Sequence, residues 1–82
     1  MALAVLRTLA EMRVPVPERV AVIGLTDLEM SRYSSPPLTT VSIPSEAMGA
    51  AAAKTLLQRL DGDDSLPRRI LFPARLVPRG SA

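Results

Sequence analysis

Two consecutive prolines, Pro36 and Pro37, lie near the middle of this 82-residue chain and limit what it can fold into. They cannot lie inside a helix, and they remove two backbone donors from any sheet. The residues from Thr39 to Val41 follow closely, and their β-branched side chains favour an extended chain. The sequence therefore predicts a stiff stretch that leads into a short strand over 39–43, which Pro44 ends.

A continuous apolar run, Val20 to Leu25, precedes the prolines. A run without alternation is typical of a strand buried on both faces, as in a parallel sheet covered by helices. The run is followed by Thr26 and Asp27, which begin a polar loop over 26–37 with room for one helical turn. Ligands of open α/β sheets bind at the carboxyl ends of the strands, so this loop lies where a ligand is expected.

Two amphipathic helices flank these strands in the sequence. The first begins near Ala2 and ends at or before Val14, because Pro15 and Pro17 forbid its continuation. The second covers about 45–60, with Met48 expected in the core, and ends at an acidic turn over 61–64. Short strands are predicted over 69–72 and 75–77, so the elements indicate an α/β chain with too few strands to close a core alone.

The composition excludes several kinds of catalytic and metal chemistry. The chain has no Cys and no His, and its one lysine is Lys54. No disulfide, thiolate metal site or histidine base is therefore available, and no nucleophile stands beside a base. Asp61, Asp63 and Asp64 lack the spacing of a calcium loop and indicate a solvated turn. We expect neither an enzyme nor a cofactor nor a metal.

The charge pattern favours an ordinary surface over a nucleic-acid-binding one. The net charge is +2, and the basic residues are scattered, with only Arg68 and Arg69 adjacent. A DNA-binding surface needs a concentrated basic patch. No apolar run approaches the roughly 20 residues that span a bilayer, so no membrane partner is expected.

Three features together resemble one known family. They are "PPLTTV" at 36–41, Gly49 eight residues later, and "LVPRGS" at 76–81. In this order the segments resemble the carboxyl-terminal third of the LacI/GalR family of bacterial transcriptional repressors. The resemblance implies an α/β fold, namely part of the type I periplasmic-binding-protein-like fold. It corresponds to the end of a two-lobed sensor domain, with parallel strands and flanking helices.

The resemblance also implies a division of the chain between the two lobes of the sensor. Residues 1–37 would belong to the lobe distal to DNA, 38–43 to a crossover strand, 44–73 to the DNA-proximal lobe, and 74–82 to the return into the distal lobe. The DNA-binding helix-turn-helix of the family is absent, so operator DNA would be contacted only through that missing part. The implied protein is a homodimer located in the cytoplasm.

Candidate ligand-binding residues follow from one motif of the family. There, a strand ending in Gly, an aromatic residue and two Asp places its first Asp at the effector cleft. The matching residues are Gly24, Leu25, Thr26 and Asp27, so Thr26 occupies the first Asp position with one hydroxyl and no charge. Asp27 matches the second Asp, which binds ligand or caps the following turn. Ser45 matches a helix start that approaches the effector.

Candidate interface residues lie in the segment from Leu28 to Ser35, which matches a loop near the dimer interface of the family. Tyr33, with Arg32 beside it, is a candidate interface anchor, as tyrosine often is. The alternative is that Tyr33 simply lies over its own loop. Arg79 is expected to form a structural ion pair or cap.

Three functions from different classes remain open. The first is the effector-sensing and dimerisation portion of a LacI-type regulator, truncated and without its DNA-binding head, that responds to a small hydroxylated effector such as a sugar. The second is a free-standing module that associates with itself through open strand edges. The third is a fragment of an exported sugar-binding protein of the same fold.

Overall fold

A computed structural model describes all residues from Met1 to Ala82, which form two compact units. The first unit contains residues 1–43 and 74–82, and the second contains residues 44–73. The chain therefore leaves the first unit after Ile43 and returns to it at Ala74.

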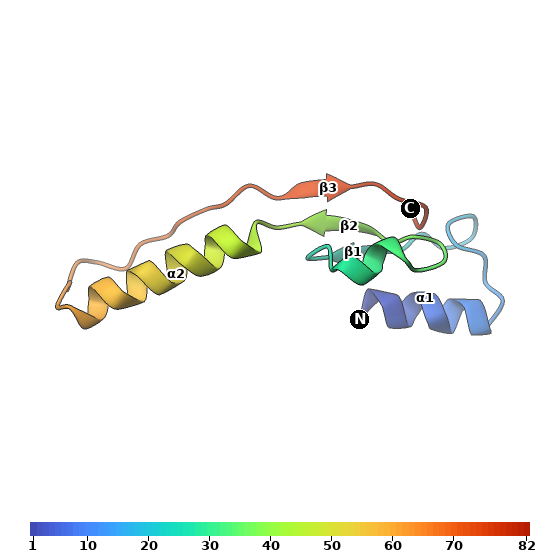
Figure 1. The fold of residues 1–82 in the computed structure, drawn as a ribbon. Helices are drawn as coiled ribbons and strands as arrows, with labels where there is room; N and C mark the ends of the chain where they lie inside the picture. The colour runs from blue at the N-terminus through green and yellow to red at the C-terminus, as the bar shows by residue number, and fades with distance from the viewer. The chain divides into compact units, whose positions relative to one another are not determined.

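The first unit contains a three-stranded sheet in the order β1–β2–β3 (Figure 1). Strands β1 (Ile23–Leu25) and β2 (Thr39–Ser42) are parallel, whereas β3 (Arg75–Val77) pairs with β2 in the antiparallel direction. The predicted strands over 39–43 and 75–77 are confirmed, apart from one residue at the end of β2. Strand β2 is the central strand, so it forms backbone hydrogen bonds with β1 on one side and with β3 on the other.

Helix α1 (Ala2–Glu11) packs against β1 and closes a small apolar core. The helix ends before Pro15, as predicted from the prolines. Leu6, Val22 and Leu38 are the buried core residues, and they come from α1, from the residue before β1 and from the residue before β2. Partly buried side chains pack around them: Ala2, Leu3, Leu9 and Val16.

The prediction that the apolar run Val20 to Leu25 is a strand buried on both faces is wrong. Only its second half is β1, and Ile23 and Leu25 are 58% and 67% exposed. Alternate residues of a strand point to opposite faces, and α1 covers the face that contains Val22. Ile23 and Leu25 therefore point away from the helix, on a face that no other element of the unit covers.

Helix α2 (Ser45–Leu60) is the only regular element of the second unit. It has the predicted bounds, and it ends where Gly62 takes a left-handed conformation with φ of 97°. The prediction that Met48 belongs to the core is wrong, since its side chain is 39% exposed and no residue of α2 is buried. The unit holds no second element against which the apolar side of α2 could pack.

The predicted strand over 69–72 is also wrong, because residues 63–74 form neither helix nor strand. Pro67 and Pro73 bracket the segment and remove backbone donors on both sides. A strand also requires a neighbouring strand, and the second unit contains none. Ile70 and Leu71 are accordingly exposed.

The polar loop after β1 contains one short 3-10 helix, η1 (Glu29–Arg32), which is the single helical turn that its composition predicted. The backbone amide of Leu38 donates to the carbonyl of Ser31 at 2.8 Å, which ties this turn to the start of β2. None of the helices combines the length and the hydropathy that a bilayer-spanning segment requires.

Gly24 is expected to resist substitution, because a Cβ there would lie 2.8 Å from Leu38 Cδ2 and 3.3 Å from Ala2 Cβ. We expect Gly24→Ala to lower the free energy of unfolding by about 1 to 3 kcal/mol through overpacking. Gly49 is the matched control, since it lies inside α2 and a Cβ there would meet nothing within 4 Å. Gly49→Ala should raise helix stability by about 1 kcal/mol. Chemical denaturation of both variants measures the difference, and equal effects would contradict this packing.

Candidate functional site

The loop after β1 has an unusual backbone conformation at the two residues that the motif singles out. Thr26 has φ of 85° and Asp27 has φ of 49°, both in the left-handed region. This region is unfavourable for a β-branched residue such as threonine, and such strain persists only where surrounding contacts hold it. The conformation of Thr26 therefore has to be explained by what the loop contacts.

Two hydrogen bonds attach this loop to the central strand. The amide of Thr26 donates to the carbonyl of Val41 at 2.8 Å, and the amide of Asp27 donates to Thr40 Oγ1 at 3.2 Å. Thr40 is completely buried, so its hydroxyl is a fixed acceptor. The loop is thus held by one backbone and one side-chain group of β2.

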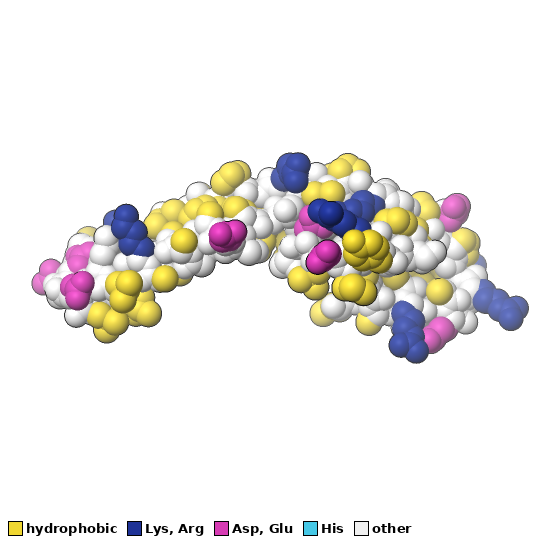
Figure 2. All heavy atoms as spheres, viewed as in Figure 1, with side chains coloured by type: hydrophobic (Ala, Val, Ile, Leu, Met, Phe, Trp, Pro, Cys, Tyr) yellow, Lys and Arg dark blue, Asp and Glu magenta, His cyan; other side chains and the backbone are white.

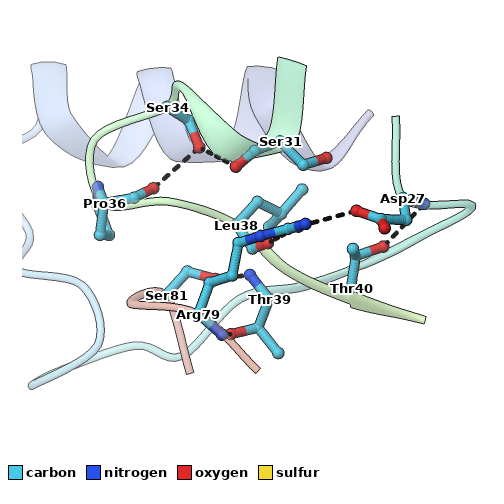
Figure 3. Close-up of polar contacts among 9 residues, drawn as sticks. All are labelled: Asp27, Ser31, Ser34, Pro36, Leu38, Thr39, Thr40, Arg79 and Ser81. Carbon is cyan, nitrogen blue, oxygen red and sulfur yellow. Dashed lines mark hydrogen bonds and ion pairs between the residues drawn. The ribbon is translucent and has the colours of Figure 1, made fainter. Parts of the chain in front are cut away.

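A third contact comes from the tail that follows β3. Arg79 Nη1 lies 2.8 Å from Asp27 Oδ1, and the two side chains are only 14% and 16% exposed (Figure 3). The same nitrogen donates to the carbonyl of Leu38 at 2.9 Å. Asp27 Oδ1 is buried and has no hydrogen-bond partner, so its contact with Arg79 is not aligned as a hydrogen bond. We therefore describe it as an ion pair, which confirms the structural pairing predicted for Arg79.

Ser81 organises the other side of this tail. It is completely buried, and its hydroxyl accepts from the Thr39 amide at 2.8 Å and donates to the Val22 carbonyl at 2.6 Å. Its backbone adds two bonds, from the Val22 amide to its carbonyl and from its own amide to the Pro37 carbonyl, both 2.9 Å. Sequence reasoning missed this residue, although the closing motif "LVPRGS" that contains it was the available signal.

The side chain of Thr26 is placed differently from that of Asp27. Thr26 is exposed, and its hydroxyl makes no hydrogen bond within the chain. A threonine hydroxyl offers one donor and two acceptor positions. An accessible hydroxyl on a firmly held loop at the carboxyl end of β1 is the arrangement expected of a ligand contact.

The other predicted site residues lie elsewhere. Ser45 is the exposed first residue of α2 and belongs to the second unit. Arg32 ends η1 and Tyr33 follows it, and both are exposed, Tyr33 by 69%. The sequence neighbours Thr26 and Asp27 are therefore the two predicted ligand-binding residues that lie together in one unit.

A groove of about 450 Å³ lies beside β1 in the first unit. Most of the residues that line it are apolar, so its lining is not suited to a polyhydroxylated ligand. The lining comes from α1, β1, η1 and the residues next to them: Met1, Ala2, Leu3, Val5, Val22, Ile23, Gly24, Leu25, Leu28, Ser31 and Leu38.

The charged residues form neither a metal site nor a basic patch. No three acidic residues are grouped to hold a metal ion. In the acidic turn, Asp63 Oδ1 accepts from the Ser65 amide at 2.9 Å, and this backbone hydrogen bond holds the pKa of Asp63 below its usual value. On the face seen in Figure 2, several of the Lys and Arg side chains lie beside acidic side chains.

Comparison with known proteins gives a consistent result along the whole chain. Residues 1–82 match the family described as periplasmic binding protein-like domain. The HTH-type transcriptional regulator GalR of Lacticaseibacillus casei is 35% identical over all of this chain and 25% of its own length. The lactose operon repressor of Rhizobium radiobacter is 32% identical over all of this chain and 72% of its own length.

A solved structure agrees with these sequence relatives. The complex of the transcriptional regulator CelR with cellobiose superimposes with a TM-score of 0.88 and 37% identity, over 99% of this chain and 25% of the other. The chain spans about a quarter of the length of most curated relatives that it matches. The fold expected from the resemblance, a piece of the periplasmic-binding-protein-like α/β domain, is confirmed.

Proposed function

Because this chain belongs to the periplasmic binding protein-like domain family, and within it to the LacI-type transcriptional regulators, we propose that it senses a small effector and forms dimers in such a regulator. The regulator acts in the cytoplasm as a ligand-responsive repressor. Operator DNA is contacted through a part of the regulator other than these 82 residues. No step of this function is enzymatic.

The single observation that carries the proposal is the position of Thr26. Its hydroxyl is exposed and unpaired at the carboxyl end of β1, on a loop that β2 holds in a left-handed conformation. A contact that is already ordered before binding loses little conformational entropy when the ligand binds. Thr26 therefore supports recognition of a ligand group that forms hydrogen bonds.

We propose a sugar or another polyhydroxylated molecule as the effector. The relative CelR was solved with cellobiose, and a threonine hydroxyl is both a donor and an acceptor for sugar hydroxyls. Ser45, the first residue of α2, is a further candidate contact, assigned from its motif position. Asp27 is the other candidate contact on the loop, through its carboxylate. The Oδ1 atom of this carboxylate is buried against Arg79.

Isothermal titration calorimetry with cellobiose and a panel of other disaccharides tests this proposal. We expect Thr26→Ala to weaken binding of the sugar that binds best by about three- to tenfold, the loss of one neutral hydrogen bond. Thr26→Asp should bind at least as well as the wild type, because a carboxylate accepts stronger hydrogen bonds and Asp tolerates a positive φ.

Thr8→Ala is the matched control, since Thr8 is an exposed threonine of α1 outside the loop. It should leave sugar affinity unchanged. Absence of binding by every sugar in the panel, or equal affinity of the wild type and Thr26→Ala, would contradict the proposal.

We also propose that Arg32 and Tyr33 contribute to a homodimer interface. Both are exposed at the end of η1, and a tyrosine ring that is 69% exposed has a large apolar surface to bury in a partner. Sedimentation equilibrium should give a dimer, and Tyr33→Ala should raise its dissociation constant by at least about tenfold. Leu66→Ala, which changes an 85% exposed side chain of the second unit, should have no such effect. A wild-type chain that stays monomeric would contradict the dimer.

Two other functions were open from the sequence. A self-associating module predicts a stable dimer that binds none of the sugars, so the two experiments above separate it from the regulator. A fragment of an exported sugar-binding protein is disfavoured because the relatives above are transcriptional regulators.

A further inference from the structure

We propose that Arg79 is a positioning residue for the effector loop, which we define as Thr26 and Asp27. In this inference Arg79 acts through the Asp27 carboxylate, and it links the loop to β3 while Thr40 and Val41 link it to β2. Effector contact at Thr26 is thereby coupled to both strands that connect the two units of the chain. The inference rests on the proposed function, because it assigns a role to a residue beside that site.

The position of the Arg79 guanidinium is fixed by its own contacts. Nη1 donates to the Leu38 carbonyl at 2.9 Å and lies 2.8 Å from Asp27 Oδ1. Leu38 is itself a buried core residue, so its carbonyl cannot shift easily. Both charged side chains are largely shielded from water, which leaves the attraction between them weakly screened by salt.

The backbone of Arg79 is held as well as its side chain. Its amide donates to Thr39 Oγ1 at 2.8 Å, and Thr39 is buried at the start of β2. Arg79 follows β3 by two residues, with Pro78 between them to restrict the backbone. The backbone and the guanidinium of Arg79 are therefore both held by hydrogen bonds. Its guanidinium faces the Asp27 carboxylate, as the close-up shows (Figure 3).

The effector loop is attached to the rest of the unit through β2 and the tail of β3. Its two amides bond Val41 and Thr40, and its one close charged partner is Arg79. All three contacts come from β2 or from the tail of β3. The chain leaves the first unit directly after β2 and returns directly before β3. A displacement of either strand must therefore change the support of the left-handed Thr26.

A purely structural role for the pair makes a different prediction from a positioning role. If Arg79 only stabilises the first unit, its loss speeds hydrogen exchange throughout the sheet and lowers ligand affinity only through unfolding. If Arg79 positions the loop, its loss releases Thr26 and Asp27 while the sheet stays closed. Local exchange rates separate the two, because each amide reports its own opening.

The test is amide hydrogen exchange by NMR on the 82-residue chain, together with calorimetric titration of cellobiose. In Arg79→Gln we expect the Thr26 and Asp27 amides to exchange at least about tenfold faster, whereas the Val22 amide, bonded to Ser81, changes little. Asp27→Asn should have the same effect on the loop, and the double variant should add nothing further there, because both changes remove the ion pair between Arg79 and Asp27. Arg75→Gln is the control, since Arg75 is an exposed arginine of β3.

The conservative variant Arg79→Lys tests the geometry of the guanidinium. It keeps the charge but loses the planar guanidinium. The exchange rates of the Thr26 and Asp27 amides should therefore lie between those of the wild type and those of Arg79→Gln. Cellobiose affinity should follow the same order, with about a tenfold loss in Arg79→Gln when variants are compared at equal fraction folded. Equal acceleration of Val22 and the loop, or no change in the loop, would overturn the positioning role.

The experiment also separates this inference from the proposed function. Faster loop exchange in a chain that binds no sugar supports the attachment by Arg79 and contradicts the effector site. Sugar binding that Arg79→Gln leaves unchanged supports the effector site and contradicts the role of Arg79.

Discussion

Ser81→Ala is expected to lower the free energy of unfolding of the first unit by about 2 to 4 kcal/mol. The hydroxyl that it removes is completely buried and serves two backbone groups, the Thr39 amide and the Val22 carbonyl. Both groups would be left buried without a partner. The cost of an unsatisfied buried group is about 1 to 3 kcal/mol each.

Urea denaturation followed by circular dichroism measures this change. Thr8→Ala removes an exposed hydroxyl from α1 and should shift the free energy of unfolding by less than about 0.5 kcal/mol. A Ser81→Ala variant as stable as Thr8→Ala would show that the tail does not join Val22 to Thr39.

Leu38→Ala is expected to lower the free energy of unfolding by a similar amount, about 3 kcal/mol. Leu38 is 3% exposed, and it is the residue through which the start of β2 joins the core of Leu6 and Val22. Its Cδ2 would lie 2.8 Å from a Cβ at Gly24, so its removal would leave space beside Gly24. The lost contacts and the remaining cavity both contribute to the cost.

Thermal and chemical denaturation of Leu38→Ala should be compared with Leu76→Ala, which shortens a 55% exposed leucine of β3. The control should lose less than about 1 kcal/mol, since little surface returns to water. A second expectation follows from the contact with Gly24: Gly24→Ala should cost less in the Leu38→Ala background, because the atom that it would meet is gone. Equal costs in both backgrounds would contradict the packing.

Local signals in the sequence predicted the elements well where those elements depend on nearby residues. The prolines marked the end of α1 and the start of β2, and the apolar spacing of 45–60 predicted α2. The burial of these elements was predicted poorly. Ile23, Leu25 and Met48 are exposed because the layers that would cover them are not formed by the 82 residues.

The candidate site shows the same difference between local and distant causes. The motif after β1 identified Thr26 and Asp27, but not their left-handed conformation. That conformation depends on Thr40 and Arg79, and the bond from Ser81 to Val22 joins residues 59 positions apart. Contacts between residues so far apart produce no periodic pattern in a single sequence, so only the structure reveals them.

These contacts connect the fold to the proposed function. The same central strand that holds the effector loop also carries the chain toward the second unit, and the strand that returns carries Arg79. In an allosteric regulator, ligand binding must favour one of two arrangements through contacts that differ between them. We propose the attachments of Thr26 and Asp27 to Thr40, Val41 and Arg79 as candidates for such contacts.

Titration of cellobiose into the 15N-labelled chain, followed by two-dimensional NMR, tests the central claim most directly. We expect the largest chemical-shift changes at the amides of Thr26 and Asp27, with smaller changes at Thr40 and Arg79, which hold the loop. In Thr26→Ala the same changes should require a higher sugar concentration. Shift changes that avoid the loop and cluster around the apolar groove beside β1 would contradict sugar recognition at Thr26.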